Sequence, residues 1–206
     1  MTNPTSTVFI VDDDDGVRKS LSFLLQAAGL TVEVFASAQN FLERYDPYAG
    51  GCVVLDVRMP EMTGLELQEY LNVHGAIIPV IFITGHADVA MAVEAMRHGA
   101  YDFLQKPFLD QDLLERVRRA LEDDHSNRLR LQQHDAIRER LVSLTPRERE
   151  ILDLVTSGKA NKVMAAQLGV SQRTVEIHRA HVMEKMGAKS VAQLVRMVMD
   201  LEYRGS

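Results

Sequence analysis

Short apolar runs alternate with helical patterns along the first 120 residues. The runs occupy residues 7–11, 31–35, 52–55, 80–83 and 101–104, and those at 7–11, 52–55 and 80–83 are almost continuously apolar, which is typical of strands buried on both faces. Between them, apolar positions recur at helical spacing over 16–28, 37–45, 64–73 and 88–98, and again from about residue 110. This alternation predicts an α/β domain, a five-stranded parallel flavodoxin-like (βα)5 sheet covered by helices on both faces.

The second half of the chain has helical spacing only. Residues 111–142 keep a helical pattern whose apolar face thins among many charges, with neither Pro nor Gly to interrupt it. We interpret residues 122–142 as a helical linker, and a flexible hinge at 122–127 is the alternative. Short helices at 146–156, 161–168, 172–186 and 190–201 then predict an all-α domain. The predicted domains are therefore 1–121, 122–142 and 143–206.

Charge separates the two halves of the chain. Residues 1–124 hold 9 Lys and Arg against 20 Asp and Glu, a net charge of −11, whereas residues 125–206 hold 14 against 9, a net charge of +5. This asymmetry favours a divalent metal as partner of the first half and nucleic acid as partner of the second. No apolar run approaches the ~20 residues of a membrane span, no basic leader precedes the first strand, and Cys52 has no second cysteine for a disulfide. We therefore expect a cytoplasmic protein with no membrane partner.

Side chains that suit phosphoryl chemistry stand where four predicted strands end. Asp12 and Asp13 follow the first strand and Asp56 the third; Thr84 and Lys106 follow the fourth and the fifth. In the strand order 2-1-3-4-5 these ends meet at one edge of the sheet, where open α/β sheets bind ligands. Three carboxylates in one pocket require a cation, and oxygen ligands suit Mg²⁺ or Mn²⁺. One carboxylate can then attack a phosphoryl group whose charge the metal, a hydroxyl and an ammonium stabilise.

Aspartates after strands also serve as turn residues and helix caps. We expect Asp14 and Asp15 to cap the helix that begins near residue 16. The occurrence of Asp-Asp, Asp, Thr and Lys at four strand ends, in this order, favours a built pocket over chance.

These strand ends carry the motifs of a known family. The matching segments are Val11-Asp-Asp13, Leu55-Asp56-Val-Arg-Met-Pro-Glu-Met-Thr-Gly64, Thr84-Gly-His86 and Lys106-Pro-Phe108. Residues 5–121 resemble the receiver domain of bacterial response regulators. The resemblance implies that Asp56 is the phosphoacceptor. The metal ligands that it implies are Asp12, Asp13, Asp56 and the Arg58 main-chain carbonyl.

The same resemblance implies a switch. Receivers of the family switch through the Thr and an aromatic residue on the fifth strand, which here are Thr84 and Phe103, and Phe103 replaces the commoner Tyr. A ring without a hydroxyl can still swing inward, although Phe103 as a plain core residue is the alternative. The family's Lys-Pro bond is usually cis, so we expect a cis bond before Pro107 that aims Lys106 at the phosphate. The expected output face surrounds residues 88–108.

Residues 161–186 have the pattern of a helix-turn-helix. A short amphipathic helix, the turn Gly169-Val-Ser171 and a longer helix follow one another, and the second helix of such a unit enters the major groove. Arg and Lys there can neutralise phosphates, Glu176 can accept from a cytosine amino group, and Ile177 and Ala180 can touch thymine methyls. The candidate DNA contacts are Lys162, Ser171, Arg173, Thr174, Glu176, Ile177, Arg179, Ala180 and Lys185. A packed helical domain without a DNA role has the same spacing and stays open on spacing alone.

Further motifs argue against a packed helical domain without a DNA role. They are Leu144-Thr-Pro-Arg-Glu148, Glu150-Ile-Leu152, Asn161-Lys162, Ala165-Ala166-Gln-Leu168 and Thr174-Val175-Glu-Ile-His178. They resemble the LuxR-type DNA-binding domain, and the whole chain resembles the FixJ-like branch of the NarL/FixJ response regulators. Some relatives carry Lys at the positions of Glu176 and Ala180, so their base preference does not transfer to this chain.

The resemblance implies a DNA-binding response regulator of a two-component system. A sensor histidine kinase would phosphorylate Asp56, and phosphorylation would control homodimerisation, binding to double-stranded DNA and transcription. Activation, with RNA polymerase as a further partner, is the expected direction. We expect slow autodephosphorylation and no independent enzyme activity.

Three other functions remain open on the sequence. The first is a Mg²⁺-dependent phosphohydrolase, although no obvious second acid or base adjoins Asp56, which Val57 and Arg58 follow. The second is a regulator that responds to a small molecule, which needs an enclosed apolar pocket. The third is a DNA-binding protein whose receiver serves only for dimerisation.

Overall fold

The computed structural model describes residues 6–85 and 89–202, so His86 of the Thr84-Gly-His86 motif lies outside the described residues. The chain divides into two units, residues 1–128 and 129–206. Residues 122–128, predicted as the start of the linker, thus belong to the first unit. Among the described residues, no helix is long and apolar enough to cross a membrane.

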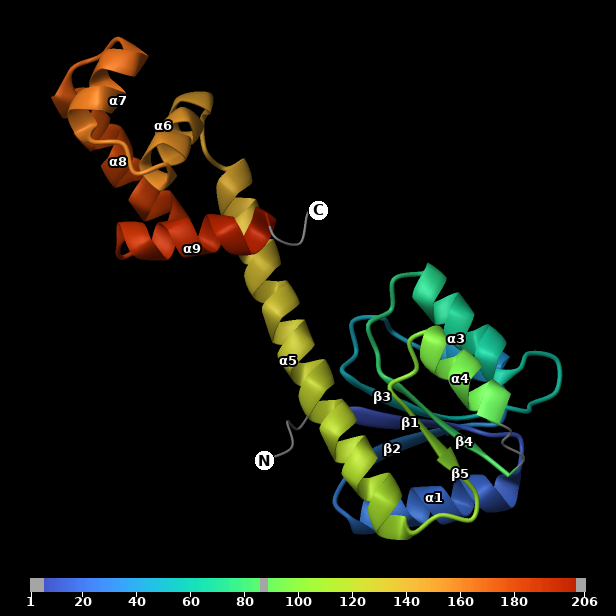
Figure 1. Cartoon of the computed structure of the whole chain (residues 1–206). Coiled ribbons are helices and arrows are strands. Elements are labelled where there is room, and N and C mark those ends of the chain that lie inside the picture. Colours follow the sequence, from blue (N-terminus) through green and yellow to red (C-terminus); the bar gives the residue numbers. More distant parts are fainter. Residues whose placement is uncertain (1–5, 86–88, 203–206) are drawn as a thin grey trace. The chain divides into compact units, whose positions relative to one another are not determined.

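The strands of the first unit form one parallel sheet (Figure 1). They are β1 (Thr7–Val11), β2 (Thr31–Phe35), β3 (Gly51–Asp56), β4 (Val80–Thr84) and β5 (Asp102–Gln105). Their order in the described part of the chain is β2-β1-β3-β4-β5, as predicted. β1 lies inside the sheet, where Thr7 is in register with Thr31 of β2 and Gly51 of β3. The predicted flavodoxin-like fold is therefore confirmed.

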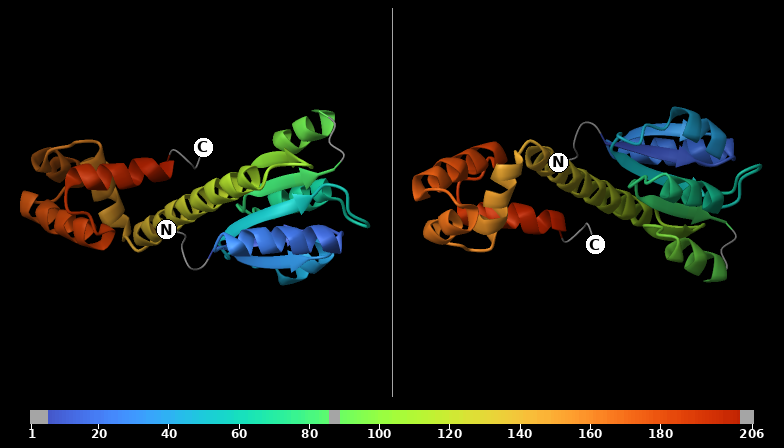
Figure 2. Two further views of the ribbon diagram at one scale, coloured as in Figure 1. Left: turned by 90° about the horizontal axis from the view of Figure 1, so that it is seen from below. Right: turned by 90° about the horizontal axis from the view of Figure 1, so that it is seen from above.

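Helices cover both faces of the sheet (Figures 1 and 2). They are α1 (Asp15–Ala27), α2 (Ala38–Arg44), α3 (Gly64–Val73), α4 (Val89–Arg97) and the first part of α5 (Asp110–Val142). Neighbouring residues of a strand point to opposite faces. In β1, Phe9 and Val11 therefore pack with buried residues of α2, α3 and α4, whereas Val8 and Ile10 pack with those of α1 and α5. The result is two apolar layers, which explains why the inner strands β1, β3 and β4 are almost continuously apolar.

Side-chain caps fix where several helices begin. The Asp14 carboxylate accepts hydrogen bonds from the backbone N–H groups of Gly16 and Val17, so Asp14 caps α1 as predicted. Asp15 instead lies in the first turn and pairs with Lys19, at 2.6 Å between Oδ2 and Nζ. Because the Asp14 carboxylate satisfies N–H donors that have no partner inside the helix, α1 begins directly after the strand end that carries the acidic pair.

The fifth helix is continuous through the region where a hinge was the alternative. α5 runs over 33 residues, from Asp110 to Val142. Asp124 is buried there, and its carboxylate accepts from the Gly51 N–H and the Arg128 Nε, both at 2.9 Å. Arg128 also donates to the Pro47 carbonyl at 3.0 Å. These bonds explain why the first unit extends to residue 128.

The second unit is a bundle of short helices (Figure 2). They are α6 (Pro146–Thr156), α7 (Asn161–Leu168), α8 (Gln172–Met186) and α9 (Val191–Glu202), which matches the predicted all-α domain. Their core includes Ile151, Met164, Val175 and Leu194. The end of α5 belongs to this unit, because Arg140 Nη1 donates to the Met186 carbonyl at the end of α8, at 3.0 Å.

We predict that Gly64→Ala destabilises the first unit by about 1–3 kcal/mol, because an added methyl group overpacks this site. A Cβ at Gly64 would lie 2.2 Å from the main-chain oxygen of Asp56 and 3.0 Å from the ring of Phe82, so α3 must shift away from β3. Urea unfolding followed by circular dichroism measures the change. Gly85→Ala is the control, since a Cβ there has no neighbour within 4 Å. Equal stability of the two variants would contradict this prediction.

Candidate functional site

The candidate pocket lies at the carboxyl edge of the sheet. Asp12 follows β1, Asp56 ends β3, Thr84 ends β4 and Lys106 follows β5. These strands are neighbours in a parallel sheet, so their carboxyl ends converge on one edge. The structure thus places these four predicted residues at one place in the fold.

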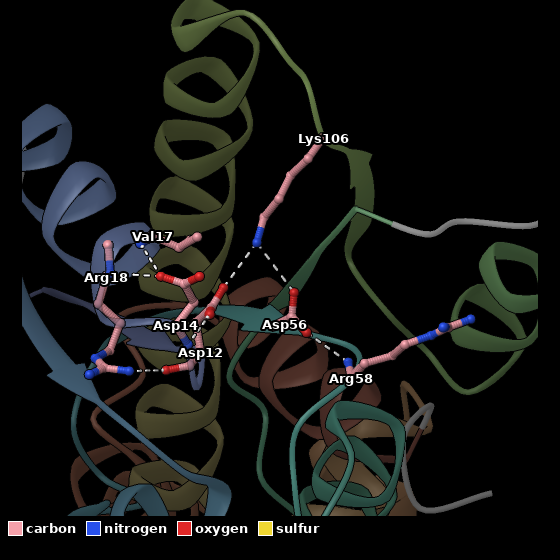
Figure 3. Close-up of polar contacts among 8 residues, drawn as sticks. Asp12, Asp14, Val17, Arg18, Asp56, Arg58 and Lys106 are labelled. Atoms are coloured by element: carbon pink, nitrogen blue, oxygen red, sulfur yellow. Dashed lines mark hydrogen bonds and ion pairs between the residues drawn. The ribbon is translucent and has the colours of Figure 1, made fainter.

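Lys106 joins the two buried carboxylates of this pocket (Figure 3). Its Nζ lies 3.0 Å from Asp12 Oδ2 and 3.3 Å from Asp56 Oδ1. Asp12 is 1% exposed and Asp56 is 8% exposed. Two carboxylates so close repel each other, and the ammonium compensates both charges.

Burial raises the pKa of the Asp56 carboxyl above its ordinary value. The Arg58 backbone N–H opposes this shift by donating to Asp56 Oδ2 at 2.7 Å. The negative charge of Asp12 raises the pKa further, and Lys106 lowers it. Desolvation and a few specific donors therefore act on the pKa of Asp56 in opposite directions. Perturbed pKa values of this kind are typical of functional sites.

The hydrogen bonds of Asp12 fix the direction of its carboxylate. Its Oδ1 accepts from the Asp14 N–H at 2.9 Å, which leaves Oδ2 directed at Lys106. Its main-chain carbonyl accepts from Arg18 Nη1 at 2.6 Å (Figure 3). The first turn of α1 thus orients the acidic residue that ends β1.

We predicted that Asp12, Asp13 and Asp56 share one pocket, and the structure differs in part. Asp13 is exposed to solvent. Within residues 6–85 and 89–202, no three His, Cys, Asp or Glu side chains form a group that could hold a metal. A third carboxylate beside Asp12 and Asp56 would add repulsion, whereas an exposed one keeps its hydration. The two buried carboxylates of this edge are therefore those of Asp12 and Asp56, and a metal role for the exposed Asp13 stays a prediction.

The donor set still fits a magnesium ion. Mg²⁺ keeps several waters and needs only one or two carboxylates from the protein. Asp12 and Asp56 supply buried carboxylate oxygens, and the exposed Asp13 follows Asp12 directly. The Arg58 backbone N–H donates a hydrogen bond to Asp56, whereas the Arg58 side chain is exposed and points away from Lys106 (Figure 3). A metal role for the Arg58 carbonyl stays a prediction.

The three predicted switch residues lie near this edge. Thr84 is 2% exposed. Phe103 is half-buried, and its ring centroid lies 6.4 Å from that of Phe82 on β4. The Lys106–Pro107 bond is cis, as expected, and Pro107 is exposed. The expected output face contains the exposed side chains of Val93 and Met96 on α4, whereas Asp88 lies outside the described residues.

The second unit contains the predicted helix-turn-helix. α7 ends at Gly169, whose φ of 66° is left-handed and suits glycine. Ser171 caps α8, because its Oγ accepts from the Thr174 N–H at 3.1 Å. Val175 and Val182 of α8 are buried. One side of α8 therefore packs on the bundle, and the other faces solvent.

The candidate DNA contacts fall into two groups. Thr174 and Arg179 are half-buried, and the exposed candidates are Lys162, Ser171, Arg173, Glu176, Ile177, Ala180 and Lys185. Two of the cations already have partners on other helices. Arg179 donates to Asn161 of α7, and Lys185 Nζ lies 2.6 Å from Glu148 Oε2 of α6. These cations attach α8 to the rest of the bundle.

Comparisons with known proteins agree with both halves. Residues 8–118 match the response regulator receiver domain, and residues 142–198 match the bacterial regulatory proteins of the luxR family. The transcriptional regulatory protein FixJ of Azorhizobium caulinodans is 47% identical over 192 residues, which cover 93% of this chain and 91% of that protein. The chain belongs to the NarL/FixJ family of response regulators.

Further relatives of this response regulator match over nearly its whole length. The response regulator protein TodT of Pseudomonas putida is 42% identical over 202 residues, which cover 98% of this chain and 89% of that protein. The solved structure of the response regulator StyR has a TM-score of 0.88 at 44% identity and covers 95% of this chain and 98% of that chain. The FixJ relative is a transcriptional regulatory protein, and this chain combines a receiver with a LuxR-type DNA-binding domain.

Sequence reasoning missed the partners that position these residues. Arg18 lies four residues after the α1 cap, Asp14. That position in the sequence gives no signal that the Arg18 guanidinium donates to the Asp12 carbonyl. Glu148 gave a signal, the Thr145-Pro-Arg-Glu148 capping box, and the structure has this box. The motif did not reveal that the same carboxylate pairs with Lys185, because that contact joins residues of two different helices.

We predict that the Glu148–Lys185 pair stabilises the second unit in a pH-dependent way. The Lys185 ammonium, followed by the Thr145 backbone N–H, lowers the pKa of Glu148 from 4.5 to about 2. Because the folded pKa is lowered, the stabilisation is complete above about pH 4.5 and is lost as the pH falls towards 2. Glu148→Gln removes this contribution.

The measurement is the unfolding free energy of the full chain in urea between pH 2 and pH 6, for wild type and Glu148→Gln. The difference between the two proteins should shrink towards the acid end. Glu184→Gln, at an exposed position of α8, makes the same charge change and should show no such convergence. A difference that does not vary with pH would contradict the assignment to the ion pair.

Proposed function

We propose that this response regulator is a phosphorylation-controlled transcription factor whose phosphoacceptor is Asp56. The observation that carries the proposal is the contact of Lys106 with both Asp12 and Asp56 in one buried pocket. A receiver in this family implies a sensor histidine kinase as donor, and a LuxR-type domain implies double-stranded DNA as target.

The pocket's own side chains account for the transfer. An Asp56 carboxylate oxygen attacks phosphorus, a P–O bond forms, and the P–N bond to the kinase histidine breaks as that histidine takes up a proton. The Arg58 N–H holds Asp56 Oδ2, which leaves Oδ1, the atom near Lys106, as the nucleophile. Lys106 can then compensate charge on the transferred group. The Thr84 hydroxyl at the end of β4 is the proposed second donor.

Magnesium or manganese is the proposed cofactor. Asp12, Asp13 and Asp56, together with the Arg58 carbonyl, would hold it. When bound, the ion neutralises charge on the phosphoryl oxygens. We expect only a slow loss of the phosphoryl group to water and no independent enzyme activity, because no obvious second acid or base adjoins Asp56, which Val57 and Arg58 follow.

Phosphorylation is proposed to control the second unit through the receiver's output face. Movement of the Thr84 hydroxyl towards the new charge, with an inward swing of the Phe103 ring, would alter the face formed by α4 and β5 and favour homodimers. A dimer suits two DNA half-sites about one helical turn apart. Transcription activation through RNA polymerase is the proposed outcome.

We predict that Asp56→Asn abolishes phosphorylation by a small phosphodonor in the presence of Mg²⁺, because an amide oxygen is not an effective nucleophile. Intact-protein mass spectrometry measures the added phosphoryl group. Asp153→Asn, at an exposed site on α6, is the control and should be phosphorylated like wild type. Equal labelling of the Asp56 variant would place the phosphoacceptor elsewhere.

Selection of bound duplexes from a random DNA pool tests the regulatory step. The full chain is used with Mg²⁺, in one arm with beryllofluoride as a mimic of the phosphoryl group and in the other without it. We expect a two-fold symmetric site to be enriched only with the mimic. Equal enrichment in both arms would contradict phosphorylation control and leave the DNA-binding role intact.

A further inference from the structure

We propose that α8 reads base edges through Glu176, Ile177 and Ala180, which select cytosine amino groups and thymine methyl groups. The proposal rests on the DNA-binding function and adds the base preference. In this proposal the residues that contact bases differ from the cations Arg179 and Lys185, which hold α8 in place.

The first observation is the arrangement of exposed side chains on α8. Arg173, Glu176, Ile177 and Ala180 are exposed, and their spacing of three, four and seven residues from Arg173 places them on one helix face. Ile177 is 48% exposed although it is a large apolar residue. The N-terminal residues of a recognition helix are the ones that contact base edges. This face is therefore the part of α8 that enters the groove.

The second observation is that two predicted DNA contacts are already engaged. The guanidinium of Arg179 bonds Asn161, and the ammonium of Lys185 pairs with the carboxylate of Glu148. Either cation would have to leave a charged or polar partner in order to reach DNA, and that partner would lose its hydrogen bond. We assign both residues to positioning α8 against α7 and α6.

Glu176 differs from these cations. In the part of the chain that the structure describes, no hydrogen bond or ion pair joins its carboxylate to another residue. A carboxylate only accepts hydrogen bonds, and the major-groove donors are the amino groups of cytosine and adenine. If the Glu176 carboxylate faced guanine or the thymine carbonyl, it would lose its hydrating water without gaining a hydrogen-bond donor. Carboxylates in grooves accordingly pair with cytosine.

The apolar neighbours complete the preference. The Ile177 and Ala180 side chains cannot bond to bases, but they can contact the C5-methyl of thymine. Residues 176 and 180 are separated by about 6 Å along the helix, which corresponds to about two base-pair steps. The cytosine and the thymines should therefore fall within about three consecutive base pairs of each half-site.

Selection with four versions of the full chain tests the assignment. With Mg²⁺ and beryllofluoride, the wild type should enrich one invariant cytosine in each half-site. Gln pairs with adenine and Lys with guanine, so Glu176→Gln should replace this cytosine by adenine and Glu176→Lys by guanine. Each protein should prefer its own site by about fivefold or more. Glu184→Gln, an equal charge change further along α8, should enrich the wild-type sequence.

The outcomes separate the two claims. The same enriched sequence for all four proteins contradicts the base assignment alone. A change shared by Glu176→Gln and Glu184→Gln also contradicts it, because it reports charge rather than a base contact. Enrichment of no sequence by the wild type contradicts the DNA-binding function itself.

The methyl contacts have their own readout on the selected duplex. Replacing one thymine by deoxyuridine removes only the C5-methyl. For a thymine facing Ile177 or Ala180, the affinity of the wild type should fall about fourfold, which corresponds to the loss of one buried methyl-sized apolar group. Ile177→Ala should abolish the penalty at the thymine that Ile177 contacts. An unchanged affinity for every deoxyuridine duplex would overturn the assignment of the apolar residues.

Discussion

The receiver depends on one electrostatic constraint, the convergence of buried carboxylates at the ends of β1 and β3. Parallel strands direct Asp12 and Asp56 to the same edge, and leaving such ions without a partner costs several kcal/mol each, about the size of a domain's stability. Lys106 compensates both. Under the proposed function, a phosphoryl group on Asp56 would add negative charge to the same place and would compete with Asp12 for this ammonium.

The DNA-binding unit uses charge in a different way. Its ion pairs and hydrogen bonds hold helices against one another: Glu148 with Lys185, Asn161 with Arg179, and Arg140 with the Met186 carbonyl at the end of α8. These contacts fix both the middle and the end of α8. The side chains exposed in the first half of α8 include the carboxylate of Glu176 and the apolar groups of Ile177 and Ala180, together with Arg173. Rigid attachment of the helix would favour the selective readout proposed for these side chains, because a binding site needs supporting residues that hold it in place.

Much of this architecture was predictable, because β1, β3 and β4 are continuous apolar runs that end in the functional residues. The helices α6, α7 and α8 begin and end at the predicted residues, since caps, Pro and Gly mark them. The exposure of Asp13 was not predictable, because sequence spacing does not say which of two adjacent carboxylates is buried. Residues 122–128 were assigned to a linker because their apolar face ends, whereas a buried ion pair, Asp124 with Arg128, attaches them to the receiver. Contacts between side chains distant in sequence, such as Lys185 with Glu148, leave no periodic signal.

The central claim is that charge at Asp56 changes the affinity of the second unit for DNA. The most direct test is a fluorescence anisotropy titration of one selected duplex with the full chain in Mg²⁺, before and after beryllofluoride is added. Coupling between two sites of a protein is typically about 5- to 150-fold, and we expect tightening in that range for the wild type and none for Asp56→Asn. An identical dissociation constant for the wild type with and without beryllofluoride, in a sample whose Asp56 is shown by mass spectrometry to accept phosphate, would contradict the account.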